Sequence, residues 1–219
     1  IIYESTGDNT FAQRYSNLID LHQVDGAKVI ADLDGDGLLE IAFSGLFGYV
    51  HILESPSNDV WQEIFTDTTG LENAYPATGG LDTDGNGKPE LFVAGDILDP
   101  FGEDRTYVYE AIGDNSFVRV ATLIANDGAT GGVRNVVAAT QGVKRLEYVL
   151  GDYRHLRVFH AVAPGEWIMA ASILDPTPNS HTRLAAFDAN RNGRDELFWA
   201  CTGVAGPVCS TLVLESPGI

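Results

Sequence analysis

Short apolar runs separated by polar turns recur along the whole chain. Segments such as "EIAFSG", "ELFVAG" and "ELFWAC" are rich in aliphatic and aromatic residues, and Gly, Asp and Asn punctuate the stretches between such runs. This composition and these lengths are typical of β-strands. No segment combines a convincing amphipathic helical spacing with helix-capping signals. The pattern therefore predicts an all-β fold.

One recurring segment is an apolar run followed by an acidic loop. Its copies are "VIADLDGDGLLEIAFSG", "ATGGLDTDGNGKPELFVAG" and "RLAAFDANRNGRDELFWAC". Their first aspartates, Asp32, Asp82 and Asp188, are separated by 50 and 106 residues, and 106 is twice 53. This period predicts a further copy near residues 133–140. The segment "VRNVVAATQGVKRLEYVLG" lies there, but Thr140 replaces the first aspartate, so we interpret it as a degenerate repeat without the metal loop.

A second pattern lies between the acidic loops. An apolar run, a polar turn and an aromatic residue follow one another in "IIYESTGDNTF", "HILESPSNDVW", "YVYEAIGDNSF" and "RVFHAVAPGEW", and "LVLESPGI" begins in the same way. The aromatic residues Phe11, Trp61, Phe117 and Trp167 are spaced by 50, 56 and 50 residues, and each begins another strand-like run. The first aspartates and the aromatic residues thus recur with one period, which predicts units of about four short strands: one on each side of the acidic loop and two around the polar turn.

A period of about 50 to 56 residues with four strands per unit is typical of β-propeller blades, which bury their faces on their neighbours. We expect one propeller domain or fragment over residues 1–219, with a half-blade at 1–20 and blades at approximately 25–70, 76–125, 132–175 and 182–219. Two interpretations stay open. The chain is a fragment of a larger ring, in which case oligomers are possible, or it is a small ring closed by the N-terminal strand "TFAQRYS".

The acidic loops offer oxygen ligands at alternate positions, and calcium prefers carboxylate, amide and main-chain carbonyl oxygens. Counted from the first aspartate of each loop as position 1, glycine occupies position 6, where the chain must turn sharply. The predicted calcium ligands are Asp32, Asp34, Asp36, the Leu38 carbonyl and Glu40 in the first loop, Asp82, Asp84, Asn86, the Lys88 carbonyl and Glu90 in the second, and Asp188, Asn190, Asn192, the Arg194 carbonyl and Glu196 in the third.

These loops are not EF-hands. An EF-hand needs a bidentate glutamate at position 12 and flanking helices, whereas position 12 is Phe43, Val93 or Trp199 within strand-like runs. Metal-free Asp-Gly turns are common, but three copies in register with a structural period favour calcium. Magnesium demands stricter geometry and is less suited. Because the loops carry four, three and two carboxylates, we expect two to three ions, with affinity falling in that order.

The loops, the period and the strand layout resemble those of the FG-GAP/VCBS family, whose best-known members are the integrin α-subunit propellers. The resemblance covers nearly the whole chain. It implies a calcium-stabilised β-propeller, usually extracellular or at the cell surface, with calcium ligands at the fifteen positions given above. Phe47 and Gly48 correspond to the "FG" of the family name, while a clear "GAP" is absent. Thr140 breaks the pattern, so no calcium site is carried to the third repeat.

Composition narrows the classes of partner. The chain has 31 acidic and 13 basic residues and a formal net charge of −18, which disfavours nucleic acid and anionic membranes as partners and favours cation binding. No apolar run approaches the ~18 residues of a transmembrane helix. The start "IIYES" suggests a mature or excised fragment. Cys201 and Cys209 flank "TGVAGPV", so they form either a short-loop disulfide, which implies an oxidising compartment, or two buried thiols.

No nucleophile elbow, zinc motif, phosphate loop or dinucleotide fingerprint is present in the sequence. The densest basic patch is "YRHLRVFH", where Tyr153, His155 and Arg157 could bind an anionic sugar or a partner's carboxylates, although such a run is more often a solvated strand. We expect a binding or adhesion module for a protein or glycan. The alternatives are a structural spacer and a part of a calcium-containing polysaccharide lyase, since some lyases are similar propellers.

Overall fold

The computed structural model describes residues 1–16, 29–45, 47–72, 78–97, 103–128, 133–142, 145–175, 181–201 and 211–215. All regular elements in these ranges are β-strands, and the strands form five antiparallel sheets. The predicted all-β class is therefore confirmed. Within the same ranges no helix is long and apolar enough to cross a membrane.

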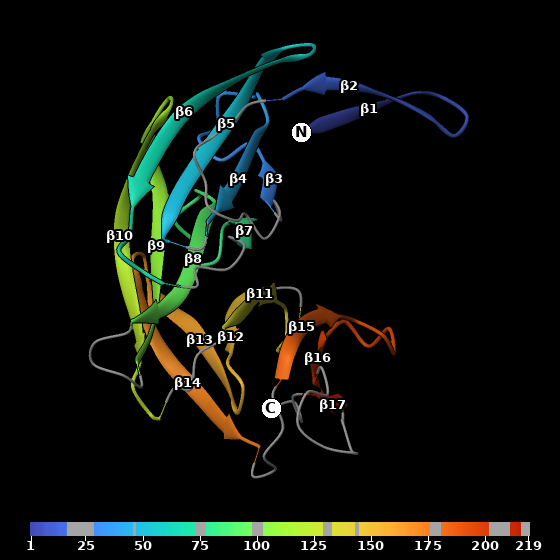
Figure 1. The fold of residues 1–219 in the computed structure, drawn as a ribbon. Helices are drawn as coiled ribbons and strands as arrows, with labels where there is room; N and C mark the ends of the chain where they lie inside the picture. The colour runs from blue at the N-terminus through green and yellow to red at the C-terminus, as the bar shows by residue number, and fades with distance from the viewer. Residues whose placement is uncertain are drawn as a thin grey trace.

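The strands follow one another in chain order within each sheet (Figure 1). An N-terminal hairpin contains β1 (Ile2–Gly7) and β2 (Thr10–Tyr15). The first sheet contains β3 (Val29–Ala31), β4 (Glu40–Ser44), β5 (Tyr49–Ser57) and β6 (Val60–Thr68). The second contains β7 (Thr78–Leu81), β8 (Glu90–Ile97), β9 (Glu103–Gly113) and β10 (Ser116–Ala125). The third contains β11 (Arg134–Ala138), β12 (Glu147–Gly151), β13 (His155–Ala163) and β14 (Glu166–Leu174), and the fourth contains β15 (His181–Phe187), β16 (Glu196–Cys201) and β17 (Thr211–Leu214).

The sheets stand side by side in a curved row (Figure 1). The first strands β3, β7, β11 and β15 lie along the inner side of the curve, and each contacts the next. The strands β6, β10 and β14 lie along the outer side. No sheet is closed. The strand β2 pairs with β1, and within the described ranges β17 pairs only with β16, so the ring closure by "TFAQRYS" that one interpretation required is not formed.

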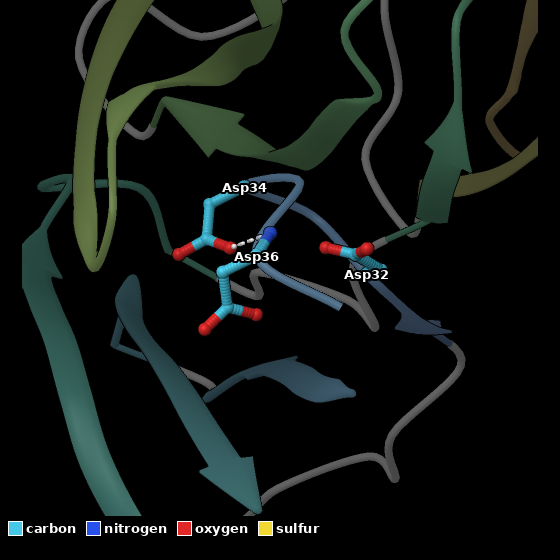
Figure 2. Close-up of side chains that lie close together, drawn as sticks. All are labelled: Asp32, Asp34 and Asp36. Atoms are coloured by element: carbon cyan, nitrogen blue, oxygen red, sulfur yellow. Dashed lines mark hydrogen bonds between the residues drawn. The ribbon is translucent and has the colours of Figure 1, made fainter. Parts of the chain in front are cut away.

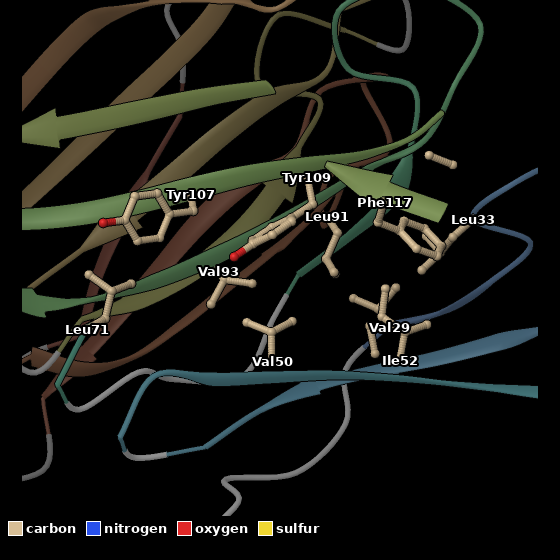
Figure 3. Packing of buried hydrophobic residues seen from close by; sticks show 12 residues of the cluster. Val29, Leu33, Val50, Ile52, Leu71, Leu91, Val93, Tyr107, Tyr109 and Phe117 are labelled. Carbon is tan, nitrogen blue, oxygen red and sulfur yellow. The ribbon is translucent and has the colours of Figure 1, made fainter. Parts of the chain in front are cut away.

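The cores lie between neighbouring sheets because alternate side chains of one strand point to opposite faces. In β8, Leu91 and Val93 pack into the cluster shared with the first sheet, and Figure 3 shows Val50 of β5 on the opposite side of that cluster. Phe92 of the same strand belongs instead to the cluster shared with the third sheet, where it stacks on Tyr148 with ring centroids 4.4 Å apart. Both faces of the second sheet are thereby buried.

The third and fourth sheets share a smaller cluster. It includes Val149 of β12, Leu156 of β13 and Trp199 of β16, and Trp199 is 1% exposed. Cys201 is the last residue of β16, but Cys209 lies outside the described residues. The predicted disulfide therefore stays a prediction.

Candidate metal centres in the acidic loops

Each acidic loop connects the first two strands of a sheet, and its first aspartate organises the turn. In the loop between β3 and β4, Asp32 accepts hydrogen bonds from the backbone N–H groups of Gly35, at 2.7 Å, and Gly37, at 3.1 Å. Gly37 has a φ of 92°, a left-handed conformation that favours glycine. The predicted need for glycine at position 6 has this physical cause.

The other two loops repeat this arrangement. Asp82 accepts from the N–H groups of Gly85 and Gly87, and Asp188 accepts from the N–H groups of Asn192 and Gly193. In all three loops the first aspartate therefore accepts from the N–H of the glycine at position 6, and its other bond goes to position 4 in the first two loops and to position 5 in the third. The first aspartate orders the backbone in all three loops, and in the first two loops the remaining carboxylates face one another.

In the first loop, ligand oxygens of Asp32, Asp34 and Asp36 lie within 4.8 Å of one another, and Figure 2 shows the three side chains together. In the second loop, the oxygens of Asp82, Asp84 and Glu90 form a similar group. Carboxylates this close repel unless a cation or a proton neutralises them.

The glutamate at position 9 is the buried member of each of these two loops. Glu40 and Glu90 are 0% exposed, and their Oε2 atoms accept hydrogen bonds from the backbone N–H groups of Leu33 and Thr83. The Oε1 atoms of both glutamates are buried and have no hydrogen-bond partner in the described part of the chain. A buried carboxylate oxygen without a partner is costly unless a cation binds it.

The electrostatics of these glutamates agree with that geometry. Burial, together with the charges of Asp34, Asp32 and Asp36, raises the pKa of Glu40 to about 7. Burial also raises the pKa of Glu90 to about 7, with Asp84 and Asp82 adding to the effect. The residues in both loops fit a cation with oxygen ligands, because such a cation would neutralise these carboxylates and occupy the unpartnered oxygens.

The third loop satisfies its carboxylates without a cation. The Oε2 of Glu196 accepts from the N–H of Ala189, and its Oε1 accepts from the amide of Asn190 at 2.5 Å. The amides of Asn190 and Asn192 also donate to Glu215, beside β17. The Asn190 amide therefore meets the oxygen of Glu196 that corresponds to the unpartnered Oε1 atoms of Glu40 and Glu90. The lower affinity of the third site stays a prediction.

In the third sheet, which has no acidic loop, a hydroxyl and an amide donate to the glutamate that begins the second strand. The Thr140 hydroxyl and the Gln141 amide donate to the buried carboxylate of Glu147, the first residue of β12. Glu147 therefore occupies the same strand position as Glu40 and Glu90 but has protein donors on both oxygens. This supports the interpretation of the segment as a repeat that lost its metal loop.

Two groups of residues near the loops were not among the ligands predicted from the sequence. The first group consists of glutamates on or beside the third strands that face the loops: Glu54, Glu110 and Glu215. The sequence does carry a signal for them, because the runs "HILES", "YVYEA" and "LVLES" share a glutamate at the same place. The backbone N–H groups of Asn115 and Gly165, in the hairpin turn of the next sheet, donate to Asp34 and Asp84 at 2.7 Å. No sequence signal specifies these contacts, because they depend on how the sheets pack.

The basic segment that could have formed a ligand site is mostly buried. Arg157 is 0% exposed, and its guanidinium donates to Asp104, Asp127 and Asp152. His155 is 8% exposed and its ring nitrogen lies 3.3 Å from the Asp152 carboxylate, while Tyr153 is half-buried. The structure thus uses the arginine to join the second and third sheets, and only Tyr153 of the three is substantially accessible.

Comparisons with known proteins leave the chain without a family assignment. No protein-family model matches it, and no curated protein sequence matches it.

Proposed function

We propose that this chain is a calcium-stabilised β-propeller, or a segment of one, of the FG-GAP/VCBS kind, and that it acts outside the cell as a binding or adhesion module for a protein or glycan. The observation that carries the calcium assignment is the pair of buried, unpartnered Oε1 atoms of Glu40 and Glu90, each next to further loop carboxylates. A cation would satisfy both oxygens and remove the repulsion between the loop side chains.

The donor atoms favour calcium over other metals. Both clusters consist of carboxylates, with no imidazole or thiolate ligand among the described residues that form them. Hard cations with oxygen ligands suit such a set, whereas zinc and copper select nitrogen and sulfur. Calcium tolerates irregular geometry better than magnesium, and an ion at the loop would link the first two strands of each sheet.

The arrangement of the sheets supports the propeller. Four-stranded antiparallel meanders stand side by side, with their first strands along one side of the curve and their cores between neighbours. This is the way in which propeller blades bury their faces. A ring would be completed by further sheets at the two open ends of the row.

The proposed setting outside the cell is supported by the exposure of the first loop. Asp36 is exposed and Asp34 is half-buried, so the ion would remain partly accessible to solvent. Oxygen sites in extracellular modules bind calcium with dissociation constants of about 10⁻⁴ to 10⁻³ M and are filled at the calcium concentration there. A glycan array probed with the calcium-loaded chain and with the EDTA-treated chain tests the ligand.

The calcium assignment predicts a change in thermal stability. Saturating calcium should raise the melting temperature over that in EDTA by about 5 to 10 °C per site, because a ligand at 100 times its dissociation constant stabilises by about 2.7 kcal/mol and 1 kcal/mol corresponds to about 2 to 4 °C. Differential scanning calorimetry of the wild type and of Asp32→Asn measures the shift. Asp8→Asn, in the exposed turn of the N-terminal hairpin, is the control. Equal melting temperatures with and without calcium would refute the proposal.

A further inference from the structure

The glutamates of the third strands meet different partners in the three loop-bearing sheets. In the second sheet, Glu110 accepts from the Asn86 amide at 2.6 Å and lies 3.5 Å from the Lys88 ammonium. In the fourth sheet, Glu215 accepts from the Asn190 and Asn192 amides. The charge of both glutamates is therefore met by donors that belong to the protein.

Glu54 of the first sheet lacks these donors. It is 2% exposed, and its Oε1 accepts from the Gln62 amide at 3.2 Å. Its Oε2 is buried and has no hydrogen-bond partner within the described ranges. The loop positions that Lys88 and Asn86 occupy in the second loop hold Leu38 and Asp36 in the first. An apolar residue and a third aspartate thus stand where the second loop supplies a cation and an amide.

The groups that do approach Glu54 are carboxylates from two different sheets. Ligand oxygens of Asp34, Glu54 and Asp114 lie within 4.8 Å of one another, and so do those of Asp36, Glu40 and Glu54, so Glu54 stands between the loop and the turn of the next sheet. Asp34 belongs to the acidic loop of the first sheet, whereas Asp114 lies in the turn between β9 and β10 of the second sheet. The neighbouring Asn115 N–H donates to Asp34 at 2.7 Å and holds this turn against the loop.

We propose that Asp34, Glu54 and Asp114 bind a second calcium ion, which joins the first sheet to the second and shares Asp34 with the ion inside the loop. The proposal rests on the proposed function, because it assigns calcium to a neighbouring group of oxygen ligands. Three carboxylates in this position, one of them buried with a free oxygen, require a compensating positive charge. A hard cation supplies it, as the Lys88 ammonium does beside Glu110.

The second loop shows why the site belongs to the first loop alone among the described loops. The turn that contacts the second loop has Pro164 where the earlier turn has Asp114, so it brings no carboxylate. The contact itself is kept, since the Gly165 N–H donates to Asp84 at 2.7 Å. The same packing of turn against loop therefore occurs with and without the extra ligands.

Counting bound ions tests the proposal. Native mass spectrometry of the wild type, titrated with calcium chloride, should show one more ion than Asp114→Asn, and calorimetric titration should show the loss of one binding event. Asp114 is an exposed turn residue, so this variant should fold. Asp8→Asn is the matched control, because Gly-Asp-Asn occurs both at residues 7–9 and at residues 113–115.

A second variant tests the same site by adding a positive charge instead of removing a carboxylate. Leu38→Lys places an ammonium at the position that Lys88 occupies beside Glu110, so this variant should also bind one ion fewer than the wild type. If both variants bind as many ions as the wild type, with unchanged affinity, this inference is wrong and the loop sites stand. If the wild type binds no calcium, the proposed function fails as well.

Discussion

At the scale of single residues, Glu40 and Glu90 govern the acidic loops. Each begins the second strand of its sheet, and each uses one carboxylate oxygen to hold the backbone of the loop and leaves the other without a partner in the described structure. One half of the carboxylate therefore orders the loop, and the other half is the oxygen proposed to bind the cation. Glu196 has the same place in the third loop, but the Asn190 amide takes the second oxygen.

The raised pKa of Glu40 predicts a pH dependence in the calcium-free protein. The pKa rises from an ordinary value of 4.5 to about 7 on folding, mainly because the group is buried. The folded state therefore holds the proton more tightly than the unfolded state, so this contribution to stability is complete below about pH 4.5 and is lost as the pH rises to 7.

Urea unfolding in EDTA between pH 5 and pH 8 measures this effect. The free energy of unfolding of the wild type should fall more from pH 5 to pH 8 than that of Glu40→Gln, whose amide does not ionise. Excess calcium at pH 8 should restore the stability that the wild type has lost, and should not do so in Glu40→Gln. Glu166→Gln, at an exposed position of β14, is the control. An identical pH profile for the wild type and Glu40→Gln would show that Glu40 does not ionise in this range.

At the scale of strands and turns, the third sheet is joined to the second by an ion network around the buried Arg157. Arg157 of β13 reaches Asp104 of β9 at 3.3 Å and Asp127, which follows β10, at 2.6 Å. Although burial opposes the effect, hydrogen bonds from Arg157 and Ser172 lower the pKa of Asp127 to about 2. Burial and the nearby Asp152 raise the pKa of Asp104 to about 8. The guanidinium holds together carboxylates that would otherwise repel one another.

Replacing this arginine should strongly destabilise the protein. Arg157→Met removes the cation but leaves the buried carboxylates, and such a loss costs about 3 to 5 kcal/mol. Chemical denaturation in saturating calcium measures the free energy of unfolding. The matched control is Arg14→Met, which breaks the exposed pair of Arg14 with Glu4 and should cost at most about 1 kcal/mol. Similar losses in the two variants would contradict a structural role for Arg157.

At the scale of the whole molecule, stability depends on the contacts between sheets. Phe92 is 0% exposed, stacks on Tyr148 of the third sheet and meets Trp167 edge-on at 6.1 Å. A sheet of this kind cannot bury its apolar residues alone, so each sheet needs its neighbours. Consecutive strands of the chain form each sheet, but the apolar clusters lie between pairs of sheets.

Truncation of Phe92 should therefore weaken the molecule as a whole. Phe92→Ala should cost about 3 to 5 kcal/mol, because it leaves a cavity between two sheets. Phe11→Ala, at a position that is 68% exposed in the N-terminal hairpin, should change the free energy of unfolding by less than about 0.5 kcal/mol. Calorimetry and urea unfolding measure both variants, and a small effect at Phe92 would mean that the sheets fold independently.

The local features of this protein follow from the sequence alone. The apolar runs predicted the strands, and the alternate spacing of Asp32, Asp34 and Asp36 predicted that their oxygens would gather in one loop, because these residues are close neighbours in the chain. Glu40 gathers instead with Asp36 and Glu54, and Glu54 comes from the third strand. Glycine at position 6 follows in the same way from the left-handed turn at Gly37. These features depend on neighbours in the chain, and a repeating pattern records them.

Only the tertiary structure decided what each loop meets. Asp114 and Asn115 reach Asp34 from the turn of the next sheet, and nothing in the first loop encodes that approach. Arg157 looked like an accessible cation in a basic strand, but packing of the third sheet on the second buried it among three aspartates. Contacts between residues far apart in the sequence depend on the placement of whole sheets, and the burial that this placement imposes determines which charges need a partner.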